Sequence, residues 1–98
     1  MNIQQLRHFI ALAEKGSFTR AAEHAHLTQP ALSRSIAQLE AELGMKLVDR
    51  IGKRCEVTAF GNVVLDHARR VLFETEELYR VVKQQHEGSA GRIRIGLG

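Results

Sequence analysis

The first 43 residues contain three runs of apolar residues at the spacing of a helix. The first run predicts a helix over 3–15, because Asn2 is a good N-cap and Gly16 follows a terminal lysine. The second run predicts a short, alanine-rich helix over 18–25 with Ser17 as its N-cap. Its small side chains allow another helix to approach closely, so we expect these two helices to pack within one small core.

The third run extends from Thr28 to Leu43 and is amphipathic. Thr28 is a good N-cap, and Pro30 falls in the first turn, where a missing amide N–H costs nothing. The apolar face consists of Leu32, Ile36, Leu39 and Leu43. The opposite face has no acidic residue and consists of Pro30, Arg34, Ala37, Gln38 and Ala41, with Ser33 beside it and Gln29 at the open tip. Alone, this stretch is an ordinary amphipathic helix, but its acid-free face also suits the approach to a polyanion.

A very short connection joins the second and third predicted helices, because only His26 and Leu27 precede the N-cap of the third. Two short helices with so tight a turn are typical of a helix-turn-helix. After Gly44 the pattern changes to alternation and predicts a β-hairpin with its turn near Gly52. The segment 43–54 carries four basic residues and one acid. A basic hairpin here is a wing that can contact phosphates or the minor groove, and a solvated surface turn is the alternative.

The fourth predicted helix is long, extending over 59–87 after the N-cap Thr58. At 1.5 Å per residue it measures about 43 Å, more than a three-helix domain can cover. Its apolar residues recur in alternating steps of four and three, which predicts coiled-coil-like pairing with a second copy of the chain. The predicted dimerisation residues are Val64, Ala68, Val71, Leu72, Thr75, Leu78, Tyr79 and Val82.

The sequence divides into three segments. We expect a winged helix-turn-helix domain over 1–58, a dimerisation helix over 59–87 and a third segment over 88–98. Within this last segment, a glycine-rich joint precedes RIRIGLG, which alternates as a strand does and has no strand to pair with. We therefore expect the sequence to be a fragment whose last residues open a further domain.

Composition restricts the class of protein. The 98 residues are 44% hydrophobic and carry 14 Lys and Arg against 11 Asp and Glu, a net charge of +3 that permits a nucleic-acid partner without requiring one. The single cysteine, Cys55, cannot form an internal disulfide. The sequence has no signal-peptide pattern and no apolar run near the roughly 20 residues of a membrane span. We expect a cytoplasmic protein without a membrane partner.

The run SFTRAAEHAHLTQPALSRSIAQLEAELGMKLVDR, followed by VTAFG, resembles the N-terminal DNA-binding domain of LysR-type bacterial transcription regulators. The resemblance covers residues 1 to about 87. It implies a mostly α winged helix-turn-helix, double-stranded DNA as partner, and a long helix that pairs in a homodimer, with higher oligomers open to the full-length protein. It implies no cofactor in this fragment, because the small-molecule effector would bind a missing C-terminal domain that RIRIGLG would open. The DNA-contacting positions that it implies are Thr28, Gln29, Pro30, Ser33, Arg34, Arg50, Lys53 and Arg54.

The chemistry of these side chains favours distinct roles. Arg34 is suited to reading guanine through O6 and N7, and Gln29 to reading adenine through N6 and N7. The hydroxyls of Thr28 and Ser33 suit phosphate contacts, which position the helix. The cations of the hairpin would supply salt-dependent affinity. In a dimer, two such helices would meet half-sites related by a two-fold axis.

Two other classes of function are weighed against DNA binding. A helical protein-association module would use the long helix, but it would give no reason for the tight turn or the basic hairpin. A metal or redox site has little support, because His24 and His26 point to different sides of a helix and Cys55 has no second cysteine. No nucleophile, base and orienting group occur together in the sequence, so we expect no enzyme and no metal site.

Overall fold

The computed structural model describes residues 1–89 and contains, within them, four helices and one β-hairpin. In chain order the elements are α1 (Ile3–Lys15), α2 (Phe18–Ala25), α3 (Gln29–Leu43), β1 (Val48–Ile51), β2 (Arg54–Val57) and α4 (Ala59–Ser89). The predicted mostly α fold with a small hairpin is confirmed. α4 ends two residues later than predicted, so the first two residues of the expected joint are helical. The strand expected over 92–98 lies outside the described residues.

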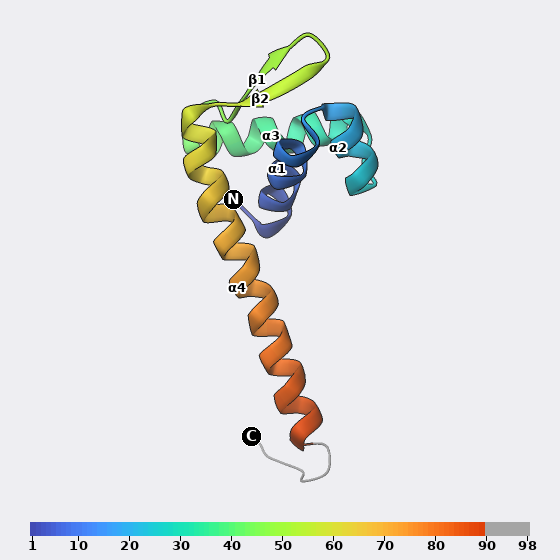
Figure 1. Cartoon of the computed structure of the whole chain (residues 1–98), viewed down its shortest axis with the longest axis vertical. Helices are drawn as coiled ribbons and strands as arrows, with labels where there is room; N and C mark the ends of the chain where they lie inside the picture. The colour runs from blue at the N-terminus through green and yellow to red at the C-terminus, as the bar shows by residue number, and fades with distance from the viewer. Residues whose placement is uncertain (90–98) are drawn as a thin grey trace.

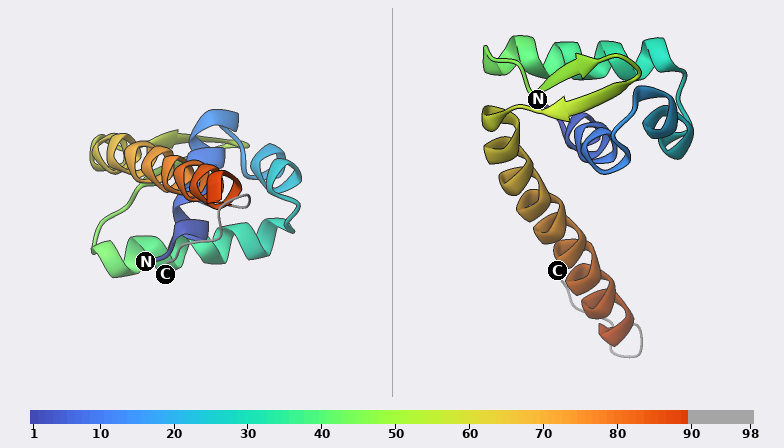
Figure 2. Two further views of the ribbon diagram at one scale, coloured as in Figure 1. Left: turned by 90° about the horizontal axis from the view of Figure 1, so that it is seen from below. Right: turned by 45° about the horizontal axis from the view of Figure 1, so that its top comes forward.

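α1 is the central element, because it packs against α2, α3, α4 and β2. Figures 1 and 2 show α3 and the hairpin at one end of the molecule, with α4 extending away from them. The five largest fully buried side chains are Phe9, Leu12, Leu32, Leu39 and Leu47. They come from α1, from α3 and from the segment that leads into β1, so the core holds α3 and the hairpin in fixed positions.

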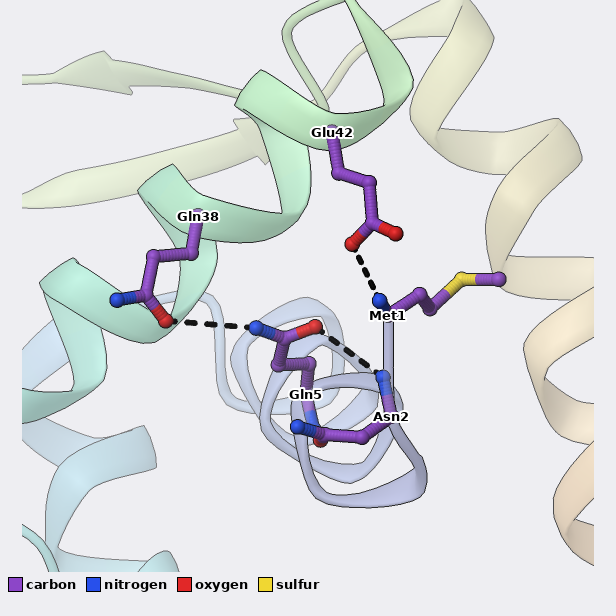
Figure 3. A network of polar contacts seen from close by, with 5 residues as sticks. All are labelled: Met1, Asn2, Gln5, Gln38 and Glu42. Carbon is purple, nitrogen blue, oxygen red and sulfur yellow. Dashed lines mark hydrogen bonds and ion pairs between the residues drawn. The ribbon is translucent and has the colours of Figure 1, made fainter.

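Polar contacts attach the beginning of α1 to the second half of α3 (Figure 3). Asn2 and Gln5 form a capping box, in which the Asn2 side chain accepts from the Gln5 N–H at 2.8 Å. The Gln5 amide then donates to Gln38 at 3.4 Å, and the Met1 ammonium pairs with Glu42. The N-cap predicted at Asn2 is therefore confirmed, and its partner Gln5 also contacts α3.

The turn between α2 and α3 is closed by the backbone. His26 adopts a left-handed conformation with φ 59°, which the sequence analysis did not predict because glycine is the usual residue there. The N–H of Leu27 then donates to the carbonyl of Ala22 at 2.8 Å. Thr28 caps α3 by accepting from the N–H of Ala31 at 3.2 Å. These contacts fix the beginning of α3 relative to α2.

The hairpin is joined to the helical core by its inward side. The strands pair antiparallel with Val48 opposite Val57, and Gly52 takes the left-handed φ of 63° that the turn requires. The side chains of Val48 and Cys55 are buried. In addition, the Cys55 N–H donates to the carbonyl of Gly16 at the end of α1, at 3.0 Å.

α4 begins against the hairpin and soon leaves the core. Thr58 caps it as predicted, accepting from the Gly61 N–H at 2.9 Å. Gly61 lies so close to the Leu47 carbonyl that a Cβ there would clash with it. Leu65 and Ala68 are 8% and 2% exposed and complete the core. The assignment of Ala68 to a dimer seam is therefore corrected, because this side chain is already covered by its own domain.

Candidate nucleic-acid interface

The outward side of the first turns of α3 is open to solvent, as the sequence analysis predicts. Gln29, Pro30 and Arg34 are exposed, and Ser33 is half-buried beside them. Thr28 is also exposed, but its hydroxyl oxygen already accepts the capping hydrogen bond. Within residues 1–89 Arg34 has no hydrogen-bond or ion-pair partner, so its guanidinium is available to an outside acceptor.

Arg50, at the third position of β1, is held by two elements of the helix-turn-helix. Its Nη2 donates to the Ser33 hydroxyl at 2.6 Å. Its guanidinium carbon also lies 3.8 Å from the centre of the Phe18 ring, a cation–π contact with the beginning of α2. Arg50 is predicted from the sequence as a source of affinity, but this bridge is not, because Ser33 is 17 residues away along the chain.

A second contact of the same kind involves Gln29. Its Nε2 donates to the hydroxyl oxygen of Thr19 at 2.9 Å, which joins the beginnings of α3 and α2. Thr19 was not among the predicted site residues. Its only signal in the sequence is a hydroxyl two residues after the N-cap Ser17, and that signal does not specify a partner ten residues later.

An open hollow of about 360 Å³ lies between the beginning of α3 and the hairpin. Its lining contains three cationic side chains, Arg50, Lys53 and Arg54, and no acidic one. Arg54 is 3.9 Å from Glu56, an exposed and therefore weak ion pair. Lys53 has no such partner in the described part of the chain. We call this feature the cationic hollow, and its charge suits a phosphodiester group.

Glu40 fixes the other end of the hairpin to α3. Its Oε2 accepts from the N–H groups of Leu47 at 2.7 Å and Val48 at 3.3 Å. Its Oε1 lies 3.8 Å from the Lys46 ammonium, which reduces the net charge of the basic segment. Helical spacing alone does not indicate this contact, because Leu47 lies seven residues further along the chain, beyond the end of α3.

The distal half of α4, residues 71–89, presents an apolar stripe without a partner among the described residues. Val71, Leu78, Tyr79 and Val82 are 43%, 62%, 71% and 55% exposed. Three other predicted seam residues are partly covered by this chain. Val64 packs against the core, and Leu72 and Thr75 are half-buried. The remaining seam is therefore shorter than predicted and begins near Val71.

Little in the described residues indicates metal or thiol chemistry. Residues 1–89 contain no group of three or more metal-ligating side chains. Burial raises the pKa of the Cys55 thiol, and the nearby charge of Arg50 opposes this shift. Cys55 is thus a buried packing residue. Across the same residues no helix is long and apolar enough to cross a membrane.

Comparisons with known proteins agree with this geometry. A family model described as bacterial regulatory helix-turn-helix protein, lysR family, matches residues 3–62. Over 97 residues the chain is 50% identical to the SDS degradation transcriptional activation protein of a Pseudomonas species and 42% identical to the DNA-binding transcriptional dual regulator OxyR of Escherichia coli K12. Each alignment covers 99% of this chain and 32% of the relative, so the chain spans about a third of their length.

Solved structures give the same result for the fold. The BenM_DBD/catB site 1 DNA complex has a TM-score of 0.82 and 34% identity, over 86% of this chain and 93% of that one. DarR of Vibrio fischeri in complex with DNA has a TM-score of 0.83 and 33% identity, over 89% of this chain and 30% of that one.

Proposed function

Because this chain belongs to the lysR family of bacterial regulatory helix-turn-helix proteins and is a sequence-specific DNA-binding domain, we propose that α3 enters the major groove of DNA. In the same proposal the cationic hollow receives the DNA backbone, and two copies of the chain pair through α4. The observation that carries it is the position of the cationic hollow directly beside the exposed first turns of α3.

Base reading falls to the beginning of α3. Arg34 reaches guanine O6 and N7 with its unpaired guanidinium, and Gln29 pairs with adenine N6 and N7. Pro30 packs between them against the base edges or the thymine methyl. Thr28 keeps its hydroxyl proton for a phosphate oxygen, which positions the helix without specifying a sequence.

Backbone binding falls to the cationic hollow. Arg50 is already fixed against Ser33 and Phe18, so it loses little side-chain entropy when a phosphate arrives. Lys53 and Arg54 lie at the exposed tip of the hairpin and supply charge with less geometric constraint. Each phosphate that is neutralised releases counterions, so affinity falls as salt concentration rises.

The second copy binds through the distal half of α4. Val71, Leu78 and Val82 recur at steps of seven and four, which places them on one side of the helix, and all three are exposed. Burying this stripe against a second copy removes apolar surface from water in both chains. A two-fold axis between the helices sets the distance between the two copies of α3, and with it the spacing of the half-sites.

We propose that the full-length protein is a cytoplasmic transcription regulator whose small-molecule effector binds outside these residues. Nothing in the proposed mode of DNA binding requires a cofactor, because the polar groups that it uses are protein side chains. The alternative of an association module that does not bind DNA is not favoured, because the chain matches DNA-binding domains. It uses the same distal half of α4 but leaves the cationic hollow without a role.

Selection from a random duplex pool tests this proposal. We expect the chain to enrich a sequence with two-fold symmetry, and we expect the logarithm of its binding constant to fall linearly with the logarithm of salt concentration. Sedimentation should show a dimer under the same conditions. An association module would still sediment as a dimer, but it would enrich no sequence and bind duplex DNA with no response to salt.

A further inference from the structure

We propose that Thr19 is a positioning residue that orients the Gln29 side chain for base reading. The inference rests on the proposed function, because it requires Gln29 to contact a base. It adds a residue of α2 that specifies sequence without touching DNA. The observation behind it is the hydrogen bond from Gln29 Nε2 to Thr19 Oγ1, at 2.9 Å.

Thr19 is well placed to hold another side chain still. The residue before it, Phe18, is 8% exposed and anchored in the core, and Ser17 caps the helix by accepting from the Arg20 N–H at 3.1 Å. Both neighbours fix the backbone of Thr19. Its own side chain is β-branched, which in a helix restricts χ1 to two rotamers. The rotamer in the structure places the hydroxyl within hydrogen-bond distance of Gln29 at the beginning of α3.

The hydrogen bond holds the Gln29 carboxamide in place, and in the structure its nitrogen is the group that faces Thr19. The last torsion of a glutamine is broad and roughly two-fold, so an unrestrained carboxamide presents its oxygen and nitrogen in either order. With one N–H of Nε2 donated to Thr19, the second N–H and Oε1 stay free. These two groups match N7 and N6 of adenine. In the donor direction that the structure shows, the contact holds the carboxamide in the adenine-reading order before DNA arrives.

Arg34 gives an internal contrast. It has no hydrogen-bond partner in the described part of the chain, so it adopts its base-reading geometry only on binding. Loss of the Thr19 hydroxyl should reduce discrimination at the base pair that Gln29 reads and leave the base pair that Arg34 reads unchanged. A merely structural role for Thr19 would weaken both positions together.

The experiment uses the 98-residue chain and a selected duplex, with a panel in which each base pair is replaced singly. The variants are Thr19→Val, which keeps the shape and removes the hydroxyl, Thr19→Ser, Gln29→Ala and the double variant Thr19→Val with Gln29→Ala. Gln29→Ala should abolish discrimination at the base pair that Gln29 reads. We expect Thr19→Val to reduce discrimination at that base pair roughly two- to tenfold. Thr19→Ser should keep it, and Thr19→Val should add no loss in the Gln29→Ala background.

Each other result overturns the inference in a distinguishable way. Wild-type discrimination in Thr19→Val, beside its loss in Gln29→Ala, would refute the positioning role and leave the proposed function intact. Equal weakening on every duplex with a shallower salt dependence would mean that Thr19 contacts a phosphate itself. No position-specific effect of Gln29→Ala would remove Gln29 from base reading and the inference with it. If wild type selected no sequence, the proposed function would fail first. Thermal unfolding midpoints confirm that each variant is folded.

Discussion

The two halves of α4 have similar apolar patterns and very different surroundings. In the first half Gly61, Leu65 and Ala68 are buried against α1 and the base of the hairpin. In the second half Val71, Leu78 and Val82 follow at steps of seven and four, which also lie on one side of a helix, and they are exposed. The periodicity therefore establishes that a helix has an apolar side but does not identify what covers it. The first half is part of the DNA-binding domain, and the second half is open to a partner.

Two leucines of α4 give the sharpest test of this difference. Leu65→Ala should lower the free energy of unfolding by about 2–4 kcal/mol, because it leaves a cavity in the core. Leu78→Ala should lower it by less than about 0.5 kcal/mol in dilute protein, because this side chain is 62% exposed. Urea unfolding at several protein concentrations measures both. Equal losses at all concentrations would mean that the two halves of α4 do not differ.

A charge placed on the apolar stripe of the distal half of α4 tests whether this stripe binds a second copy of the chain. We expect Leu78→Glu to produce a monomer in sedimentation and to weaken binding to a two-half-site duplex about 100-fold, because the two domains no longer bind as one unit. Binding to a single half-site should change little. Lys83→Gln, which changes the charge by the same amount at an exposed position on another side of the helix, is the matched control. Full affinity in a monomeric Leu78→Glu chain would exclude α4 as the source of the coupling.

Replacing Arg34 tests whether base reading belongs to the DNA-binding domain alone and does not depend on the distal half of α4. Arg34→Ala should cost about 1–3 kcal/mol of discrimination at one base pair while the dimer stays intact. Lys53→Ala should instead weaken all duplexes evenly and make the salt dependence shallower by about one ion. Binding isotherms on the substituted duplex panel, at three salt concentrations, separate the two patterns. Unchanged selectivity in Arg34→Ala would contradict the assignment of α3.

The smallest expected effect is a pH dependence of the free energy of unfolding, and it arises in the DNA-binding domain. His8 is half-buried between α1 and α3, with its Nδ1 2.8 Å from the Ser35 hydroxyl, and burial lowers its pKa below the usual 6.5. The unfolded chain therefore binds more protons than the folded chain below about pH 6.5, so the free energy of unfolding decreases as pH falls from there. His8→Gln should flatten this dependence in urea unfolding at pH 5–7. The same slope in both proteins would rule out His8.

The elements could be predicted because the signals that end them are local. Asn2, Ser17, Thr28 and Thr58 cap helices where the sequence places them, and Gly52 lies in the turn of the hairpin as expected. His26 escaped prediction because its left-handed conformation is imposed by the tight turn and not by its own preference.

The site was predictable as a surface but not as a set of contacts. The exposed side of α3 follows from helical spacing, and its exposure is confirmed. The contacts of Arg50 with Ser33 and Phe18, like that of Thr19 with Gln29, join elements whose relative positions only the folded core defines. For the same reason Ala68 was assigned to the wrong partner. The roles of these residues on DNA stay predictions.

The contacts of Gln29 and Ser33 with their neighbours also determine what can be moved between proteins. A recognition helix grafted as residues 28–43 would bring both side chains into a host without Thr19, Phe18 or Arg50. The grafted Gln29 and Ser33 would then lack the hydrogen bonds that hold them in position. The smallest transplantable reading unit is therefore the continuous segment from Phe18 to Arg50, which includes every partner named here. A chimera exchanged at these limits should carry its donor's preference with it.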